Sequence, residues 1–322
     1  MIRKLIVTLL TILPAVIGQT AFAQQFPSKP IHFVVPYPPG GAFDLMIRTL
    51  AEPLSERWGQ PVIVDNRPGG STIIGTEIVS RAPADGHTML ITGPTLIINP
   101  SLRSKLPYDA FKNFAPVTLV ARSPLVLVVN AASATTSMSE LLSDARAHPR
   151  GVSYASIGPG SIQHVIGETL NIEAKVDMVY APFSGGVPAL TALLGNHVRL
   201  AIVNYSEVTQ HLAAGTLRAL AVASAERFER LPQIPTLIES GFKDMQWDVW
   251  IGIVAPAGTP TAAVVRIQLD LAYALKLPSV RDKLALQGLS PVGSTPEAFG
   301  YEMRKQSASF ASVVKTSGIK VD

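Results

Sequence analysis

Cysteine is absent from this chain of 322 residues. Disulfide bonds, thiolate nucleophiles and cysteine-ligated zinc are therefore excluded, as is a lipid anchor on an N-terminal cysteine. Without cross-links the fold must rest on hydrophobic cores. A chain of about 300 residues is long enough for two lobes with ordinary cores.

The motifs of several cofactor and enzyme classes are missing as well. The sequence has no Gly-x-Ser-x-Gly nucleophile elbow and no Gly-Lys-Ser/Thr phosphate loop. Gly158-Pro159-Gly160 begins like a dinucleotide fingerprint, but Gln163 occupies the position of the third glycine. The histidines show no metal-ligand spacing. We therefore expect no catalytic residue, no metal and no cofactor.

A secreted hydrolase is the alternative that the serines leave open. It would need a nucleophile and a base in contact, such as Ser156 or Ser161 with His164. A lone histidine is more often structural. Only His164, beside a glycine-rich loop, is a candidate for function, and we expect no turnover of an ester.

Excess charge is also lacking. The 27 basic and 23 acidic residues become 25 and 23 once Arg3 and Lys4 are set aside, and no dense basic cluster occurs. This balance argues against nucleic acid or a membrane surface as a partner.

Residues 1–23 have the pattern of a secretory signal. Arg3 and Lys4 precede an apolar run from Leu5 to Gly18, and Ala21-Phe22-Ala23 is a small-x-small cleavage triplet. The run is shorter than the ~20 residues of a membrane span, and no later segment is long and apolar enough to insert. We predict cleavage after Ala23 and an exported chain in a bacterial periplasm.

Strand-like runs alternate with helical patterns along the rest of the chain, which predicts an α/β fold with largely parallel sheets. Phe43, Ile47, Leu50, Leu54 and Trp58 share one helical face. Pro53 predicts a kink or break in that helix, and Gly59 its end. Expected strands are 31–35, 61–64, 88–92, 125–129, 152–155, 176–181, 198–203, 217–223 and 251–255; expected helices are 44–58, 73–81, 139–147, 162–171, 188–194, 262–275, 280–287 and 296–312.

The connections near 120–125 and 246–251 are short and apolar. They favour one lobe inserted in another, with two crossings that form a hinge and a ligand cleft at the interface. We predict that residues 24–123 and 250–322 form the first lobe and that residues 124–249 form the second.

Two loops far apart in the chain read alike. Pro36–Gly41, the first jaw, and Pro182–Gly186, the second jaw, each follow a β-branched run and precede a helical pattern. Gly-Gly before a helix presents unsatisfied backbone N–H groups at its positive end, which suits an anion. Neither jaw carries Lys or Arg, so recognition must use N–H groups, hydroxyls and water.

The loop 156–161 is expected to form a third wall of the cleft. Asp44, in the first turn of the helix after the first jaw, is predicted to anchor that loop, since it would repel an anion. The candidate ligand-binding residues are Tyr37, Pro39, Gly40, Gly41, Ala42, Phe43, Thr95, Ser156, Ser161, His164, Phe183, Ser184, Gly185, Gly186 and Asn204.

Segments along nearly the whole chain after residue 23 resemble the Bug/TctC-type substrate-binding proteins of tripartite tricarboxylate transporters. The resemblance implies a two-lobed periplasmic binding protein, here expected to be a monomer, that grips the carboxylate of a small organic acid between the jaws and hands the acid to membrane permease subunits. The matching segments are Pro27–Ile31, Pro38–Asp44, Val64–Gly69, Ile98–Leu102, Leu106–Asp109, Phe114–Val117, Pro188–Thr191 and Ala255–Pro260.

Two positions depart from the family pattern. Phe43 stands where a small hydroxyl residue is common, and Ser184 where Lys or Arg is common. Both changes predict a ligand whose distal part is apolar or aromatic. An extracellular sensor for a signalling partner, using the same cleft, is the alternative function that the sequence leaves open.

Overall fold

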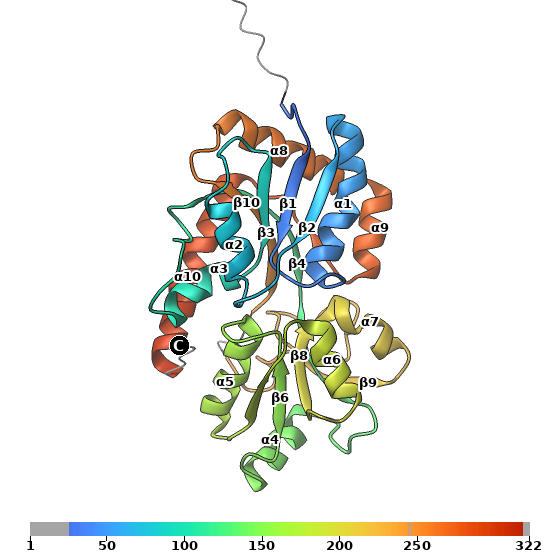
Figure 1. Ribbon diagram of the computed structural model, residues 1–322. Coiled ribbons are helices and arrows are strands. Elements are labelled where there is room, and N and C mark those ends of the chain that lie inside the picture. Colours follow the sequence, from blue (N-terminus) through green and yellow to red (C-terminus); the bar gives the residue numbers. More distant parts are fainter. Residues whose placement is uncertain (1–25, 244, 246, 318–322) are drawn as a thin grey trace, which may run out of the picture.

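The computed structural model describes residues 26–243, 245 and 247–317. The predicted signal segment 1–23 lies outside the described residues. Two α/β lobes, each built on its own sheet, are stacked end to end (Figure 1). The prediction of a two-lobed α/β fold is confirmed.

Lobe 1 is built on a six-stranded sheet in the order β11-β4-β10-β3-β1-β2. Buried hydrophobic residues of its strands and helices belong to a core that continues into lobe 2. Its strands are β1 (Ile31–Val35), β2 (Val62–Asn66), β3 (Thr88–Thr92), β4 (Phe114–Ser123), β10 (Val249–Pro256) and β11 (Ser290–Pro291), and its helices are α1 (Ala42–Trp58), α2 (Ile73–Ser80), α3 (Thr95–Leu102), α8 (Thr261–Ala274), α9 (Pro278–Leu286) and α10 (Pro296–Ser317).

Lobe 2 is built on a five-stranded sheet in the order β7-β6-β8-β5-β9. One face of this sheet packs against a separate cluster of buried residues around α6 and α7. Its strands are β5 (Leu125–Asn130), β6 (Ser153–Ser156), β7 (Val179–Pro182), β8 (Leu200–Asn204) and β9 (Leu217–Val222), and its helices are α4 (Met138–Ala147), α5 (Ile162–Ala174), α6 (Gly186–Leu194) and α7 (Tyr205–Ala213).

Both sheets are mixed, so the expectation of largely parallel sheets is wrong. β1 pairs in parallel with β2 and β3, and β6 with β7 and β8. The strands that enter a lobe from the other lobe run the other way: β10 is antiparallel to β3 and β4, and β5 to β8 and β9. A strand that enters a sheet from the neighbouring lobe arrives at the opposite end, which reverses its direction.

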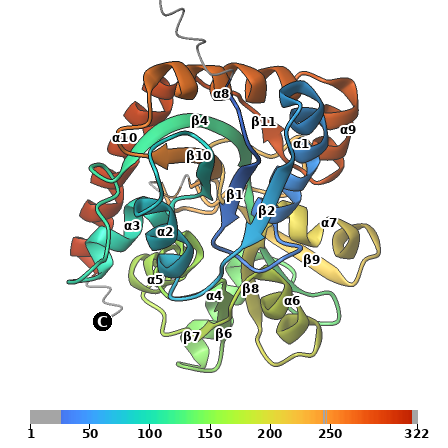
Figure 2. The same cartoon turned by 45° about the horizontal axis from the view of Figure 1, so that its top comes forward.

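The lobes are linked at more than one place. β4 ends at Ser123 and β5 begins at Leu125, so only Pro124 separates strands of different sheets. The chain returns through β10, which begins at Val249. Helix α10 lies beside α3 and also contacts α5 of lobe 2 (Figure 2). The domain boundaries proposed above stay predictions.

Two local expectations about helices are corrected. The break expected at Pro53 is wrong: α1 continues through Pro53, because Leu50 and Leu54 are fully buried in the core and hold the helix in place. α6 begins at Gly186, two residues before Pro188, which was expected at its first position. The end of α1 at Gly59, in the left-handed conformation with φ 61°, is as predicted.

No helix in the described part of the chain has both the length and the hydrophobicity to cross a membrane.

Candidate ligand-binding site

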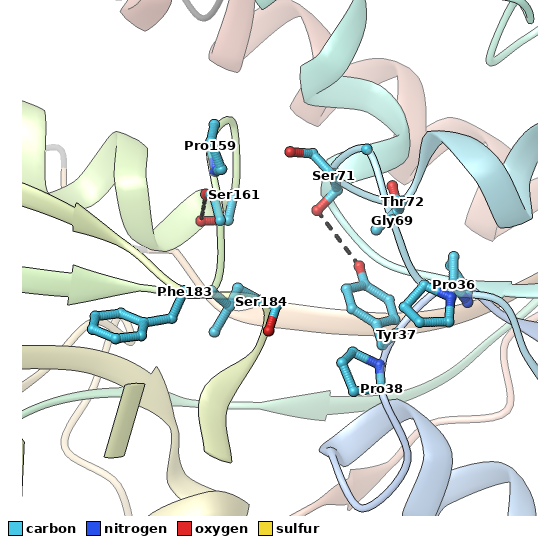
Figure 3. Close-up of a pocket in the computed structure, with 15 residues that line it drawn as sticks. Pro36, Tyr37, Pro38, Gly69, Ser71, Thr72, Pro159, Ser161, Phe183 and Ser184 are labelled. Carbon is cyan, nitrogen blue, oxygen red and sulfur yellow. Dashed lines mark hydrogen bonds between the residues drawn. The ribbon is translucent and has the colours of Figure 1, made fainter. Parts of the chain in front are cut away.

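A cavity of about 370 Å³ lies between the two lobes. Loops from lobe 1 and lobe 2 line its opposite sides, with Tyr37 across from Ser184 (Figure 3). The starts of α3 and α5 reach it through Thr95 and Ser161. Because a helix N-terminus carries partial positive charge, several of them around one cavity favour an anionic ligand.

The first jaw is held in shape by Asp44. The buried Asp44 carboxylate accepts hydrogen bonds from the Gly40 N–H at 2.9 Å and from Asn66 Nδ2 at 3.0 Å, and it pairs with Arg48 at 2.9 Å. Burial alone would raise the pKa of Asp44, but the bonds from Arg48, Gly40 and Asn66 outweigh it and hold the pKa below its ordinary value. Asn66 Nδ2 also donates to the Tyr37 carbonyl at 3.2 Å. The loop is therefore tied to α1 and to the end of β2.

The second jaw depends on two glycines. Gly185 has φ +151°, a backbone conformation that side-chain-bearing residues rarely adopt. At Gly186 the limit is space, because a β-carbon there would lie 2.2 Å from Glu207 Oε2. No side chain caps α6 at Gly185. The N–H groups at the start of α6 therefore stay open to a ligand.

The loop 156–161 is braced from inside lobe 2. Ser161 Oγ donates to the Gly158 carbonyl at 2.8 Å, and Ser156 Oγ to the same oxygen at 3.2 Å. His164 Nδ1 accepts the Gly160 N–H at 3.2 Å, and its ring stacks on Tyr180 at 3.9 Å. Burial lowers the pKa of His164 to about 4. The neutral imidazole thus serves as an acceptor that fixes the loop.

A second lobe 1 loop, Pro68–Thr72, lines the cavity and was not among the predicted site residues. Ser71 and Thr72 have φ 54° and 76°; positive values are uncommon for any residue but glycine and are strained for the β-branched Thr72. The buried Thr72 hydroxyl has no hydrogen-bond partner. The signal was present in the sequence, since strand, Pro-Gly-Gly and helix follow one another here as at the jaws.

The cavity of about 370 Å³, called the large cavity below, has no charged side chain on its walls. Proline rings, Ile157 and the Tyr37 ring supply apolar surface, while hydroxyls come from Ser71, Thr95 and Ser184 among others. Tyr37 donates to Thr95 Oγ1 at 3.5 Å, and burial raises its pKa, so it stays a neutral donor. The cavity is a neutral polar-apolar pocket.

A smaller cavity of about 30 Å³ lies between the jaws themselves. Residues of both jaws line it together with Asn204 and Glu207 at the start of α7. Sequence reasoning missed Glu207, because nothing in the local sequence ties an acidic residue of a helix to loops some 20 and 170 residues away.

Most of the predicted ligand-binding residues come together at these two cavities. Gly40, Ser156 and His164 lie on neither wall. The large cavity includes Tyr37, Thr95, Ser161, Phe183 and Ser184, and the small one Tyr37, Pro39, Gly41, Ala42, Phe43, Gly185, Gly186 and Asn204.

The rings of two of these residues, Phe43 and Phe183, lie in different positions relative to the cavities. Phe43 is 3% exposed and stacks on Tyr37 with ring centres 4.1 Å apart, so its ring supports the first jaw from behind. The Phe183 ring points away from the cavity into lobe 2 (Figure 3). Its backbone forms the wall instead.

In the described part of the chain, no group of three or more His, Asp or Glu side chains is arranged to hold a metal ion.

Two α/β lobes joined by crossing strands, with a neutral pocket between them faced by helix N-termini, define a two-lobed periplasmic binding protein. The profile of the family described as "Tripartite tricarboxylate transporter family receptor", TctC, matches residues 46–318. The chain belongs to this family, which is a family of periplasmic solute-binding proteins and not of enzymes.

Relatives and solved structures agree with this assignment. Protein BugT of Bordetella pertussis is 34% identical over 100% of this chain and 99% of its own length. A Rhodopseudomonas palustris protein solved with adipate has a TM-score of 0.87 at 33% identity, covering 92% of this chain and 99% of that one. MatC from the same species, with bound malate, has a TM-score of 0.84 at 29% identity, covering 90% and 100%.

Proposed function

We propose that this protein captures a small carboxylate-bearing organic acid by closure of its lobes and delivers the acid to the membrane permease of a tripartite tricarboxylate-type transporter. It acts as a monomer in the periplasm, after export through the N-terminal signal. The observation that carries the proposal is the uncharged cavity of about 370 Å³ between lobes, faced by helix N-termini.

An uncharged cavity suits a carboxylate for a physical reason. Backbone N–H groups at the jaws and at the start of α6 point partial positive charge at the ligand without a counter-ion that must be displaced. Ligand contacts from both lobes are complete only when the lobes are closed, so binding stabilises the closed state. The adipate and malate of the solved neighbours are acids of this class.

Under this proposal the protein releases its ligand without having changed it chemically. Ser161 Oγ donates to the Gly158 carbonyl, and His164 Nδ1 is occupied by the Gly160 N–H. A serine nucleophile would need the imidazole as its proton acceptor. In the described site that pairing is replaced by bonds within the loop, which supports a structural role for both residues.

The distal part of the ligand is apolar or aromatic. Much of the cavity wall is apolar and comes from Pro36, Pro38, Ile157 and Pro159. No lysine or arginine lines this cavity to pair with a second carboxylate. Ser184, at the second jaw, offers only a hydroxyl. An aromatic or aliphatic monoacid therefore fits the wall best, and adipate, which has four methylenes between its carboxylates, fits it better than malate or citrate.

The test begins with native mass spectrometry of freshly purified protein to detect a retained acid. Calorimetry with adipate, benzoate, malate and citrate then ranks the chemical classes. We expect adipate or benzoate to bind more tightly than citrate. Binding of citrate or malate far above every aromatic or aliphatic alternative would contradict the apolar distal site, and failure of every acid would contradict the function itself.

Delivery is tested separately. Membrane vesicles that contain the cognate permease subunits should accumulate the bound acid only when the purified protein is added. Uptake that is equal with and without the protein would contradict a role in transport.

A further inference from the structure

Glu207 is an acidic side chain placed where the two jaws meet. An ideal β-carbon on Gly186 would lie 2.2 Å from Glu207 Oε2 and 2.3 Å from Oε1, and one on Gly41 would lie 3.8 Å from Oε1. Gly41 belongs to lobe 1, whereas Gly186 and Glu207 belong to lobe 2. The Glu207 carboxyl therefore occupies the gap that narrows when the lobes approach each other.

The small cavity beside Glu207 adjoins the large one. Tyr37, Pro38 and Ile157 line both. Its volume of about 30 Å³ suits one or two water molecules or a single polar group, not a whole ligand. An acid that fills the large cavity and extends its carboxylate to the jaws thus brings that carboxylate close to Glu207.

Asn204 supplies the hydrogen bonds that Glu207 receives. Glu207 Oε2 accepts the Asn204 N–H at 3.1 Å and Asn204 Nδ2 at 3.3 Å. Asn204 is 1% exposed, lines the small cavity and forms a capping box with Glu207 at the start of α7. Each of the two residues therefore holds the other in place at the start of α7, beside the small cavity.

The elements around Glu207 bring no opposite charge to it. α7 packs against α6 and β8, which have no titratable side chain, and against β9, where Arg218 donates to backbone oxygens of 131, 133 and 135. Farther along α7, His211 is bonded to Thr216.

The first jaw does not supply a charge either. Asp44 is paired with Arg48 on α1, and the Tyr37 hydroxyl is directed to Thr95. Burial raises the pKa of Glu207 to about 7, against the lowering effect of the two bonds from Asn204. Its carboxyl therefore changes protonation state near neutral pH.

A second carboxylate beside an ionised Glu207 would be opposed by like-charge repulsion in a site with little water. We infer that the cleft binds its acid ligand together with one proton, and that Glu207 carries this proton on Oε1 and donates the O–H to the acid group held between the jaws. The proton comes from solvent, and the O–H bond of Glu207 is the only covalent bond formed. The inference rests on the proposed function.

Calorimetry with adipate as the probe tests the coupling. Above about pH 7 both adipate carboxyls are ionised, so only the protein titrates. We expect the wild-type affinity to fall by up to about tenfold per pH unit between about pH 7 and about pH 9. The binding heat should also vary with the ionisation enthalpy of the buffer, as it does when one proton is taken up.

The variant Glu207→Gln keeps the size of the side chain and supplies a neutral amide donor. We expect its affinity for adipate to be nearly independent of pH and to exceed the wild-type affinity at about pH 9. Glu229→Gln, at an exposed position of lobe 2, is the matched control and should keep the wild-type profile.

A second measurement needs no ligand. The folded-state pKa of Glu207 lies above its unfolded value, so the folded protein binds more protons and its stability falls as pH rises from about 4.5 to about 7. Glu207→Gln should lack this part of the fall in the thermal midpoint. Parallel curves for the two proteins would overturn the inference.

The remaining outcomes separate the inference from the function. Wild-type binding of adipate with a flat pH profile and no proton uptake would overturn the inference and leave the function standing. Affinity that rises with pH, together with a preference for amino acids over plain acids, would show an ionised Glu207 paired with a ligand cation and would also overturn it. If adipate, benzoate, malate and citrate all fail to bind at any pH, the proposed function and the inference fall together.

Discussion

Asp44 is a charged residue that shapes the binding loop without standing in the binding cavity. It is 2% exposed, and its carboxylate joins the first jaw, α1 and the end of β2 through Gly40, Arg48 and Asn66. An anion this close to the jaw would oppose ligand binding if Arg48 did not neutralise it. Asp44 shows that a binding site for anionic ligands tolerates a carboxylate beside it when an arginine neutralises that carboxylate.

Replacing Asp44 with Asn should remove the charge from this network while keeping its size. Charge-assisted hydrogen bonds contribute about 1.5–3 kcal/mol each, so we expect a loss of about that size in unfolding free energy and weaker adipate binding. Urea denaturation and calorimetry measure the two effects. Glu77→Gln is the control, since Glu77 pairs with the exposed Arg81, and it should change neither. An unchanged urea midpoint in D44N would contradict the anchoring role.

His164 gives a pH dependence of the opposite sign from that of Glu207. Its folded-state pKa of about 4 lies below the ordinary value of 6.5, because burial disfavours the imidazolium. The unfolded chain therefore binds more protons between these values, and stability falls as pH drops from about 6.5 to about 4. We expect His164→Gln to flatten this part of the thermal midpoint curve. His148, which is exposed on lobe 2, is the control position, and H148Q should keep the wild-type curve.

At the scale of the elements, each jaw is a loop between a strand and the start of a helix. The two jaws differ in whether they have room for a larger side chain in place of a glycine. A methyl group on Gly41 would meet nothing closer than 3.8 Å, whereas one on Gly186 would fall within 2.3 Å of the Glu207 carboxyl. Substitutions in the first jaw are thus restricted by the backbone conformation of the loop, and substitutions in the second jaw by its contact with α7.

The pair Gly41→Ala and Gly186→Ala tests this difference. We expect G186A to weaken adipate binding at least about tenfold by forcing Glu207 and the start of α6 apart, and G41A to change it by less than about threefold. Circular dichroism should show both variants folded. Equal affinities in the two variants would contradict the close contact. Gly185→Val should also weaken binding, because φ +151° excludes a β-branched residue.

The sequence predicted those elements whose signals are local. The β-branched runs, the Gly-Gly pairs and Gly59 mark where β1, α1 and α6 begin or end, and period-three-to-four apolar residues mark the buried face of α1. Strand direction was mispredicted, because a run such as 125–129 looks the same whether it pairs in parallel or antiparallel. β4, α3, α7 and the two-residue β11 were not predicted; Pro116 interrupts the pattern of β4, and Pro100 that of α3.

The site was predictable only where one loop carries the whole pattern. The jaws were predicted from their own residues, and Pro68–Thr72 could have been predicted in the same way. Glu207 could not, because its position in the site depends on the start of α7 in lobe 2 lying beside Gly41 of lobe 1. Which helix starts face the same gap is decided by the packing of both lobes, and short sequence patterns do not contain that information.

At the scale of the whole molecule, the proposed closure is expected to bend the strands that cross between the lobes and to move α10 relative to α5, which it contacts. On the hinge side, a third cavity of about 550 Å³ is lined by Arg122 and Asp248 of the crossing segments and by Glu302 of α10. Arg122 pairs with Glu302 at 3.2 Å, and Trp250 donates to Gln306 at 2.7 Å. α10 is therefore bonded to the crossing strands and is expected to move with them.

Trp247 lies on the wall of this hinge-side cavity and reports on its shape. It is 8% exposed, and its ring contacts Phe310 of α10 edge-on at 5.9 Å. Narrowing of the ligand cleft should widen the hinge side, which moves Trp247 relative to Phe310 and changes its fluorescence. We expect adipate to shift the intrinsic fluorescence of the wild type and of Trp58→Phe, because Trp58 donates to Asp270 inside lobe 1, and to shift that of Trp247→Phe much less. The amplitude of the stopped-flow fluorescence change should reach half of its maximum at an adipate concentration equal to the dissociation constant from calorimetry. A full fluorescence change in W247F, with loss of the change in W58F, would mean that the lobes do not move about this hinge.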